Sequence, residues 1–90
     1  MKARNKGNNK SELEMIPGIG KIMAADLIEL GYTTVESLRN QEPEKLYDRH
    51  CELKNCRVDR CVLYVFRCAV YFASNEVIEP EKLKWWNWKD

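Results

Sequence analysis

The sequence lacks the residue patterns on which most enzyme classes depend. It contains four glycines and one histidine in 90 residues, with no GxSxG nucleophile elbow, no P-loop and no closely paired C-x2-C zinc ligands. A chain of this length forms one small domain that buries roughly 60 % of its unfolded surface, which is too small for the second lobe that encloses a flipped base. We therefore expect no catalysis, no cofactor and no small-molecule substrate.

The four cysteines do not have the spacing of a metal site. They follow the pattern C-x4-C-x4-C-x6-C at Cys51, Cys56, Cys61 and Cys68, whereas zinc sites and iron–sulfur clusters need closer pairs of ligands. A free cysteine on an apolar helix behaves as a small hydrophobic residue. We therefore interpret the cysteines as buried free thiols and His50 as a half-buried helix residue, and we predict no metal.

Charge is distributed unevenly along the chain. Residues 1–10 carry four basic side chains and no acidic one, which predicts a disordered basic tail. Residues 11–90 hold the remaining 11 basic side chains and all 14 acidic ones, a balance of −3. Such a body is not a basic clamp, and any non-specific nucleic-acid binding should be weak and sensitive to salt. Because no apolar segment follows the tail, we expect a cytoplasmic protein without a signal peptide.

Hydrophobic periodicity predicts an all-α fold with five helices. The last of them, residues 58–74, is the most apolar and should form the centre of the core. Its apolar run contains Arg67 and is too short to span a membrane. Residues 75–90, which are rich in tryptophan, should pack on the domain formed by residues 11–74. The five helices are expected at about residues 11–16, 19–30, 35–40, 43–53 and 58–74.

The segment I-P-G-I-G-K at residues 16–21 stands at the centre of this organisation. Pro17 denies the first helix a backbone donor, and two glycines one residue apart let the chain turn sharply with no side chain above its own amides. Those amides and the positive end of the following helix would then point into open space, where an anion fits. The alternative is that the turn only connects two helices tightly. The candidate phosphate-binding residues are Gly18, Ile19, Gly20, Lys21 and Ile22.

Two further features allow both a functional and a structural interpretation. Basic side chains around the connection between the fourth and fifth helices, at Lys54, Arg57 and Arg60, are candidates for auxiliary nucleic-acid contacts. Alternatively, the arginines of this region pair with the acidic fourth helix, and its tyrosines cover the edge of the core. Three tryptophans within residues 85–88, flanked by lysines, could stack on unpaired bases. We favour the interpretation that these tryptophans cover the edge of a small core.

The pattern L-x-x-I-P-G-I-G-x-x-x-A-x-x-L at residues 13–27 resembles the helix-hairpin-helix motif. With the segments YTTVESL, PEKLYDRHC and KWWNWKD, the chain after Lys10 resembles small bacterial helix-hairpin-helix proteins of the pathogenicity-locus family, some of which are labelled mitomycin-resistance proteins. The resemblance implies a tandem helix-hairpin-helix fold, in which each motif holds one DNA strand by its phosphates without reading the bases. The second motif, around residues 53–58, contains no glycine and is expected to be degenerate.

Two functions from different classes are therefore expected. The first is a non-enzymatic module that binds DNA weakly and without sequence specificity through one hairpin, in DNA repair or damage resistance. The second is a protein–protein interaction module that keeps the same fold without binding DNA, and docks an exposed apolar or tryptophan face on a partner protein.

Overall fold

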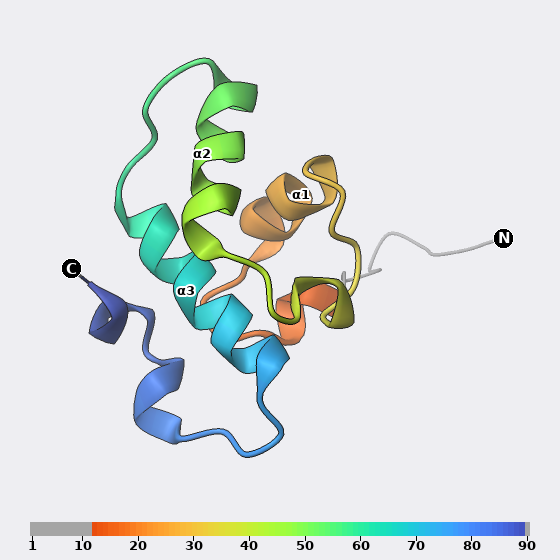
Figure 1. The fold of residues 1–90 in the computed structure, drawn as a ribbon, viewed down its shortest axis with the longest axis vertical. Helices are drawn as coiled ribbons and strands as arrows, with labels where there is room; N and C mark the ends of the chain where they lie inside the picture. The colour runs from red at the N-terminus through yellow and green to blue at the C-terminus, as the bar shows by residue number, and fades with distance from the viewer. Residues whose placement is uncertain (1–11, 90) are drawn as a thin grey trace, which may run out of the picture.

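The computed structural model describes residues 12–89, which fold as a set of helices (Figure 1). This part of the chain contains no β-strand, which confirms the all-α prediction. None of its helices combines the length and the apolar character needed to span a membrane. The predicted basic tail, residues 1–10, lies outside the described residues. The α-helices are α1 (Lys21–Glu29), α2 (Pro43–Lys54) and α3 (Cys61–Ser74), and the 3-10 helices are η1 (Glu12–Met15), η2 (Glu36–Leu38), η3 (Pro80–Leu83) and η4 (Trp85–Trp88).

Two of the five predicted helices are only single 3-10 turns. η1 is four residues long, because Pro17 follows it closely and cannot donate a helical hydrogen bond. η2 is three residues long. Two reciprocal hydrogen bonds between Thr34 and Ser37 hold its start, and Asn40, which has a left-handed backbone with φ 61°, follows its end. Such short segments cannot offset the cost of nucleating an α-helix. The five-helix count is therefore not confirmed, since α-helices form in three of the five segments.

α3 begins three residues later than predicted. The carboxylate of Asp59 accepts the amide hydrogen of Cys61 at 2.9 Å, and the amides of the next two residues reach back to the carbonyls of Asp59 and Arg60. An aspartate in this position hydrogen-bonds the backbone ahead of it and starts the helix after itself. Residues 58–60 are therefore the entry to α3 and not its first turn.

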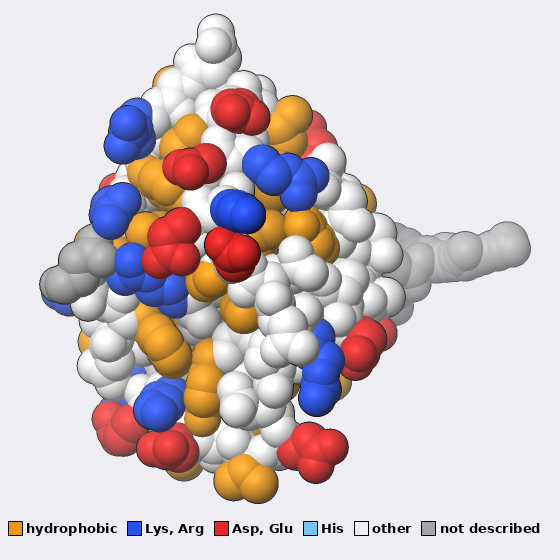
Figure 2. Space-filling model, viewed as in Figure 1, with side chains coloured by type: hydrophobic (Ala, Val, Ile, Leu, Met, Phe, Trp, Pro, Cys, Tyr) orange, Lys and Arg blue, Asp and Glu red, His pale blue; other side chains and the backbone are white. Residues whose placement is uncertain are grey.

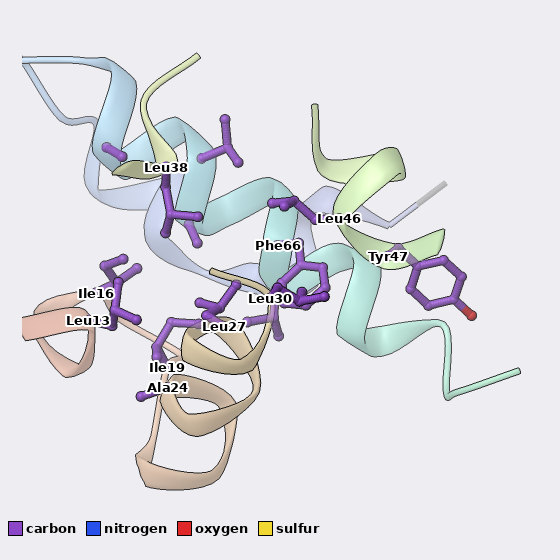
Figure 3. Close-up of a cluster of buried hydrophobic side chains, with 14 of the residues drawn as sticks. Leu13, Ile16, Ile19, Ala24, Leu27, Leu30, Leu38, Leu46, Tyr47 and Phe66 are labelled. Atoms are coloured by element: carbon purple, nitrogen blue, oxygen red, sulfur yellow. The ribbon is translucent and has the colours of Figure 1, made fainter. Parts of the chain in front are cut away.

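α3 lies at the centre of the fold, between α2 and the C-terminal 3-10 helices (Figure 1). Its Phe66 side chain is fully buried, and truncation to alanine at such a site typically costs about 3–5 kcal/mol. Figure 3 shows that the segment before α1 contributes to the same core, with Leu13, Ile16 and Ile19 side by side. The core therefore fixes the chain on both sides of the glycine turn.

The C-terminal segment is attached along α3. Trp85 packs against the core, and the ring of Trp88 lies 5.5 Å from the ring of Tyr71. The indole N–H of Trp88 donates to the carbonyl of Lys82 at 2.8 Å, and Arg67 Nη1 donates to the carbonyl of Trp88 at 2.7 Å. Two of the three tryptophans thus have the packing role that we favoured from the sequence.

Candidate nucleic-acid interface

The segment between η1 and α1 is a tight turn with the features of type II. The amide of Ile19 donates to the carbonyl of Ile16 at 3.0 Å, which leaves Pro17 and Gly18 as the two central residues. Gly18 has a φ of +91°, and the third position of a type II turn requires a positive φ. A Cβ on Gly18 would also lie 3.3 Å from Cδ1 of Trp85. Both the backbone conformation and the packing therefore require glycine here.

Gly20 is the N-cap of α1 and leaves this end of the helix open. Its backbone is extended (φ −97°, ψ −169°), it provides no side-chain cap, and its carbonyl accepts the amide of Ala24 at 2.9 Å. The amides of residues 20–22 therefore precede the intrahelical ladder, and no acceptor within residues 12–89 takes them. A Cβ built on Gly20 would meet nothing within 4 Å. The start of α1 thus presents free donors at the positive end of a helix dipole.

Four of the five candidate phosphate-binding residues lie on this open surface, and one does not. Gly18, Gly20, Lys21 and Ile22 are exposed, and the ammonium group of Lys21 has no carboxylate partner within residues 12–89. Ile19 requires a correction, because its side chain is only 4 % exposed and its amide is already bonded within the turn. Ile19 anchors the hairpin in the core and does not offer its amide to a phosphate.

The three auxiliary basic residues do not gather at this turn. Lys54 lies 3.3 Å from Asp26 and 3.7 Å from Glu29, so it connects α2 to α1. These carboxylates raise the pKa of Lys54, chiefly through the hydrogen bond to Asp26. The guanidinium of Arg60 lies 5.9 Å from the ring centre of the α2 tyrosine, and Arg57 is exposed on the α2–α3 connection at the top of Figure 1. Lys54 therefore has a structural contact, while Arg57 stays a candidate for an external one.

The start of α3 follows the turn of the predicted second motif. A side chain of the protein, the carboxylate of Asp59, hydrogen-bonds the backbone there. This carboxylate accepts the amide hydrogen of Cys61, so this amide at the start of α3 already has an acceptor within the protein. This hydrogen bond lowers the pKa of Asp59, and the same carboxylate raises the pKa of the Cys61 thiol. The missing glycine indicated a degenerate motif, but the cap itself was not predicted. An aspartate just before an apolar helix is the signal that could have found it.

Of the cysteines and the single histidine, Cys68 and His50 are buried in the fold. All four cysteines are free thiols, but the prediction that they are buried is correct only for Cys68, because Cys56 and Cys61 are exposed and Cys51 is partly buried. No group of three or more His, Cys, Asp or Glu side chains within residues 12–89 could hold a metal ion. His50 is buried, with its Nε2 atom 3.8 Å from Asp26 Oδ2 and its ring edge-on to Phe66. His50 therefore lies between α1, α2 and α3, and is more deeply buried than we predicted.

A cleft of about 560 Å³ lies on another part of the surface, between α2, α3 and η4. Its wall includes Arg67, which donates to Glu44 Oε2 at 3.1 Å and to the carbonyl of Trp88. It also includes Ser74, whose hydroxyl accepts the amide of Asn40 at 2.8 Å. These polar groups hold the walls of the cleft together, and their bonding does not point to a ligand.

Charge is mixed on the molecular surface, and apolar side chains flank the turn. Figure 2 shows basic and acidic side chains interspersed over one face of the molecule, without a large area of one sign. Met15 and Ile22, on either side of the turn, are 69 % and 78 % exposed, and Trp86 of η4 is 51 % exposed. Ile22 was one of the candidate site residues, whereas the exposure of Met15 was not predicted and Trp86 was expected to pack like the other two tryptophans.

Comparison with known proteins gives matches in sequence. A family model described as "Pathogenicity locus" matches residues 6–90. The mitomycin resistance protein McrB of Streptomyces lavendulae is 28 % identical over 78 residues, which cover 87 % of this chain and 70 % of that protein. No solved structure matches the chain.

Proposed function

This chain belongs to the pathogenicity-locus family, and from that premise we propose that it is a small, non-enzymatic helix-hairpin-helix module that binds the phosphate backbone of DNA. The observation that carries the proposal is the open start of α1, where Gly20 provides neither a cap nor a Cβ. The turn keeps its shape because Ile16 and Ile19 are buried in the core. A phosphate oxygen can therefore approach the amides of Gly20, Lys21 and Ile22 without displacing protein atoms.

The groups available at this site suit phosphate and not base edges. Backbone amides and the ammonium group of Lys21 donate charge-assisted hydrogen bonds to anionic oxygens. Contacts of this kind fix the position of a strand but carry no sequence information. The proposed binding is therefore independent of sequence.

One open hairpin supports only weak binding. Asp59 closes the start of α3, and Lys54 is already held by two carboxylates. If one or two phosphates are neutralised, the logarithm of the binding constant should fall with the logarithm of the salt concentration with a slope of about −1 to −2. The four basic side chains of residues 1–10 would make this slope steeper.

We further propose that the module acts in the bacterial cytoplasm, in DNA repair or damage resistance. The support for this role is the name of the relative from Streptomyces lavendulae, which refers to resistance to mitomycin. The proposal includes no catalytic step, because the sequence carries none of the nucleophile, phosphate-loop or metal-ligand patterns of common hydrolases.

A second candidate function is a protein-interaction module. The exposed apolar side chains of Met15, Ile22 and Trp86 favour it, since such residues are typical of a surface that docks on another protein. In that case the open amides of α1 would be solvated by water and would not hold a phosphate.

Fluorescence anisotropy with a short labelled duplex at several salt concentrations tests the proposed function. Binding should weaken as salt rises, and Lys21→Ala should weaken it by about two- to fivefold, the range of an exposed charge contact. Lys45→Ala is the matched control, because Lys45 is also exposed and pairs with its neighbour Glu42 at 3.5 Å. Absence of binding at low salt, or binding that responds neither to salt nor to Lys21→Ala, would contradict the proposal and favour the protein-interaction module.

A further inference from the structure

We propose that the hairpin holds an unpaired DNA strand, with a phosphate at the open start of α1 and a neighbouring base stacked on Trp86. This inference rests on the proposed function and adds to it the form of DNA that is bound. It is supported by the closed start of α3 and by the position of Trp86 relative to the glycine turn.

The first observation concerns how many strands the fold can hold. In the tandem arrangement, a duplex is held when each of two hairpins binds the phosphates of one strand. Here the second position is filled by the carboxylate of Asp59, 2.9 Å from the amide of Cys61. This carboxylate is ionised at neutral pH, as any ordinary aspartate is, and it repels a phosphate. One strand can therefore be bound at α1, while its complement finds no equivalent site at α3.

The second observation is a pair of aromatic rings that begins at the turn. Trp85 lies against Gly18, so closely that a Cβ on Gly18 would be 3.3 Å from its Cδ1 atom. Trp86 follows edge to face, with ring centres 5.7 Å apart and ring planes at 85°. Trp85 is partly buried against the core, whereas about half of Trp86 is exposed. The solvent-facing indole of Trp86 thus packs on Trp85, which in turn packs on Gly18 of the turn.

An indole in this position suits an unpaired base. Every base presents a π-face, so stacking on Trp86 adds affinity without adding sequence specificity. The bases of an intact duplex are already stacked on one another and would have to be unstacked first. The exposed side chains of Met15 and Ile22 beside the turn offer further apolar surface for a sugar or a base.

Trp86 is the most exposed of the three tryptophans. Trp85 packs against the core, and Trp88 is fixed by its hydrogen bond to Lys82 and by its contact with Tyr71. The indole N–H of Trp86 has no acceptor within residues 12–89. Removal of this ring should therefore leave the fold intact, which makes the proposal testable by substitution.

The experiment compares a labelled oligo(dT) strand with a duplex of the same length. Wild-type protein should bind the strand more tightly than the duplex. Trp86→Ala should lose about 5- to 150-fold in affinity for the strand, which is the contribution of about 1–3 kcal/mol per stacked base converted at 1.4 kcal/mol per tenfold. Its affinity for the duplex should not change. Trp86→Phe should keep most of the strand binding, and Val77→Ala, which shortens another exposed apolar side chain, should change neither affinity.

An abasic strand separates stacking from a structural effect. It presents phosphates but no bases, so wild-type protein and Trp86→Ala should bind it equally. Gly20→Asp serves as the reference variant, because it should abolish binding of the strand, the duplex and the abasic strand together.

The outcomes distinguish this inference from the proposed function. If strand and duplex bind equally and Trp86→Ala has no effect, while Gly20→Asp abolishes binding, the inference is wrong and the proposed function stands. If no DNA binds, both are wrong. If Trp86→Ala lowers the melting temperature and weakens binding of all three probes alike, Trp86 is a packing residue and the inference is again overturned.

Discussion

Replacement of Gly20 by aspartate should stabilise the fold and abolish phosphate binding at the same time. The backbone at Gly20 is extended, a conformation that any residue adopts, and a Cβ there would meet nothing within 4 Å. Aspartate is among the best N-cap residues, so its carboxylate should accept the open amides of α1. The variant would reproduce at α1 the arrangement that Asp59 already forms at the start of α3.

The expected increase in the free energy of unfolding is about 1–2 kcal/mol. An aspartate cap exceeds a glycine cap by roughly a few tenths of a kcal/mol, and the helix dipole adds about 0.3–1 kcal/mol. Loss of the conformational freedom of glycine in the unfolded chain adds about 0.4–1 kcal/mol. For a domain of this size, the melting temperature should rise by about 4–8 °C per kcal/mol.

DNA binding should change in the opposite direction. A carboxylate about 4 Å from the phosphate contributes a repulsion of about 1 kcal/mol in bulk water and about 4 kcal/mol near a protein surface. Repulsion alone should therefore lower the affinity by about 5- to 700-fold, and because the amides are no longer free, no measurable binding should remain.

Thermal unfolding followed by circular dichroism measures the first effect, and fluorescence anisotropy measures the second. Gly20→Asn is the matched control, because asparagine caps the same amides without a negative charge. It should share much of the gain in stability and retain more of the DNA binding. A Gly20→Asp variant that melts below the wild type, or one that melts higher but binds DNA as tightly, would refute this reasoning.

Three other predictions concern the surrounding structure. Gly18→Ala and Gly31→Ala both place alanine at a positive φ, which costs roughly 1–3 kcal/mol of strain. Only the Cβ at Gly18 would meet an indole, so Gly18→Ala should lower the melting temperature more than Gly31→Ala. Equal decreases in melting temperature would contradict the packing of Trp85 on Gly18. Because the pKa of Asp59 is lowered in the folded protein, its ionised carboxylate stabilises the fold at pH values above its unfolded pKa of about 3.9. This stabilisation is lost as the pH falls through the pKa that Asp59 has in the folded protein. Urea midpoints should therefore fall less on acidification in Asp59→Asn than in wild type, and an equal fall would argue against the cap. In native alkylation, exposed Cys56 should react first and Cys68 last, because burial raises the pKa of Cys68; mass spectrometry showing early modification of Cys68 would contradict its burial.

The turn could be predicted in place but not in detail. Proline and glycine restrict the backbone wherever they occur, so I-P-G-I-G predicts a turn from local chemistry alone. Which amides stay open depends on the hydrogen bond from Ile19 to Ile16, and this bond accompanies the burial of both side chains in the core. A local pattern does not contain that tertiary information, which is why Ile19 was wrongly assigned to the phosphate site.

The helices also differ in how far local sequence predicts them. α2 and α3 are long enough for their buried stripes of side chains to be visible as apolar spacing. The short segments η1 and η2 depend on contacts distant in sequence, such as the hydrogen bond from the amide of Val35 to the carboxylate of Glu12 at 2.6 Å. A local signal such as Pro17 indicates where η1 ends, but it does not specify the 3-10 geometry of these segments.

The tryptophans show a further limit of prediction from sequence. The three indoles have similar neighbours in the chain, so the sequence left stacking and packing as alternatives for all of them together. The structure separates them, because Trp85 and Trp88 meet the core and α3, while about half of Trp86 faces solvent. This division depends on where η4 lies along α3, which no local pattern specifies.

Titration of the protein with oligo(dT), followed residue by residue in amide NMR spectra, tests the central claim most directly. The account predicts that the largest shifts occur at the amides of Gly20, Lys21 and Ile22, because these donors have no acceptor within residues 12–89. The amide of Cys61, capped by Asp59, should barely move. Shifts that are largest at the start of α3, or amides of α1 that do not respond at saturating DNA, would contradict it.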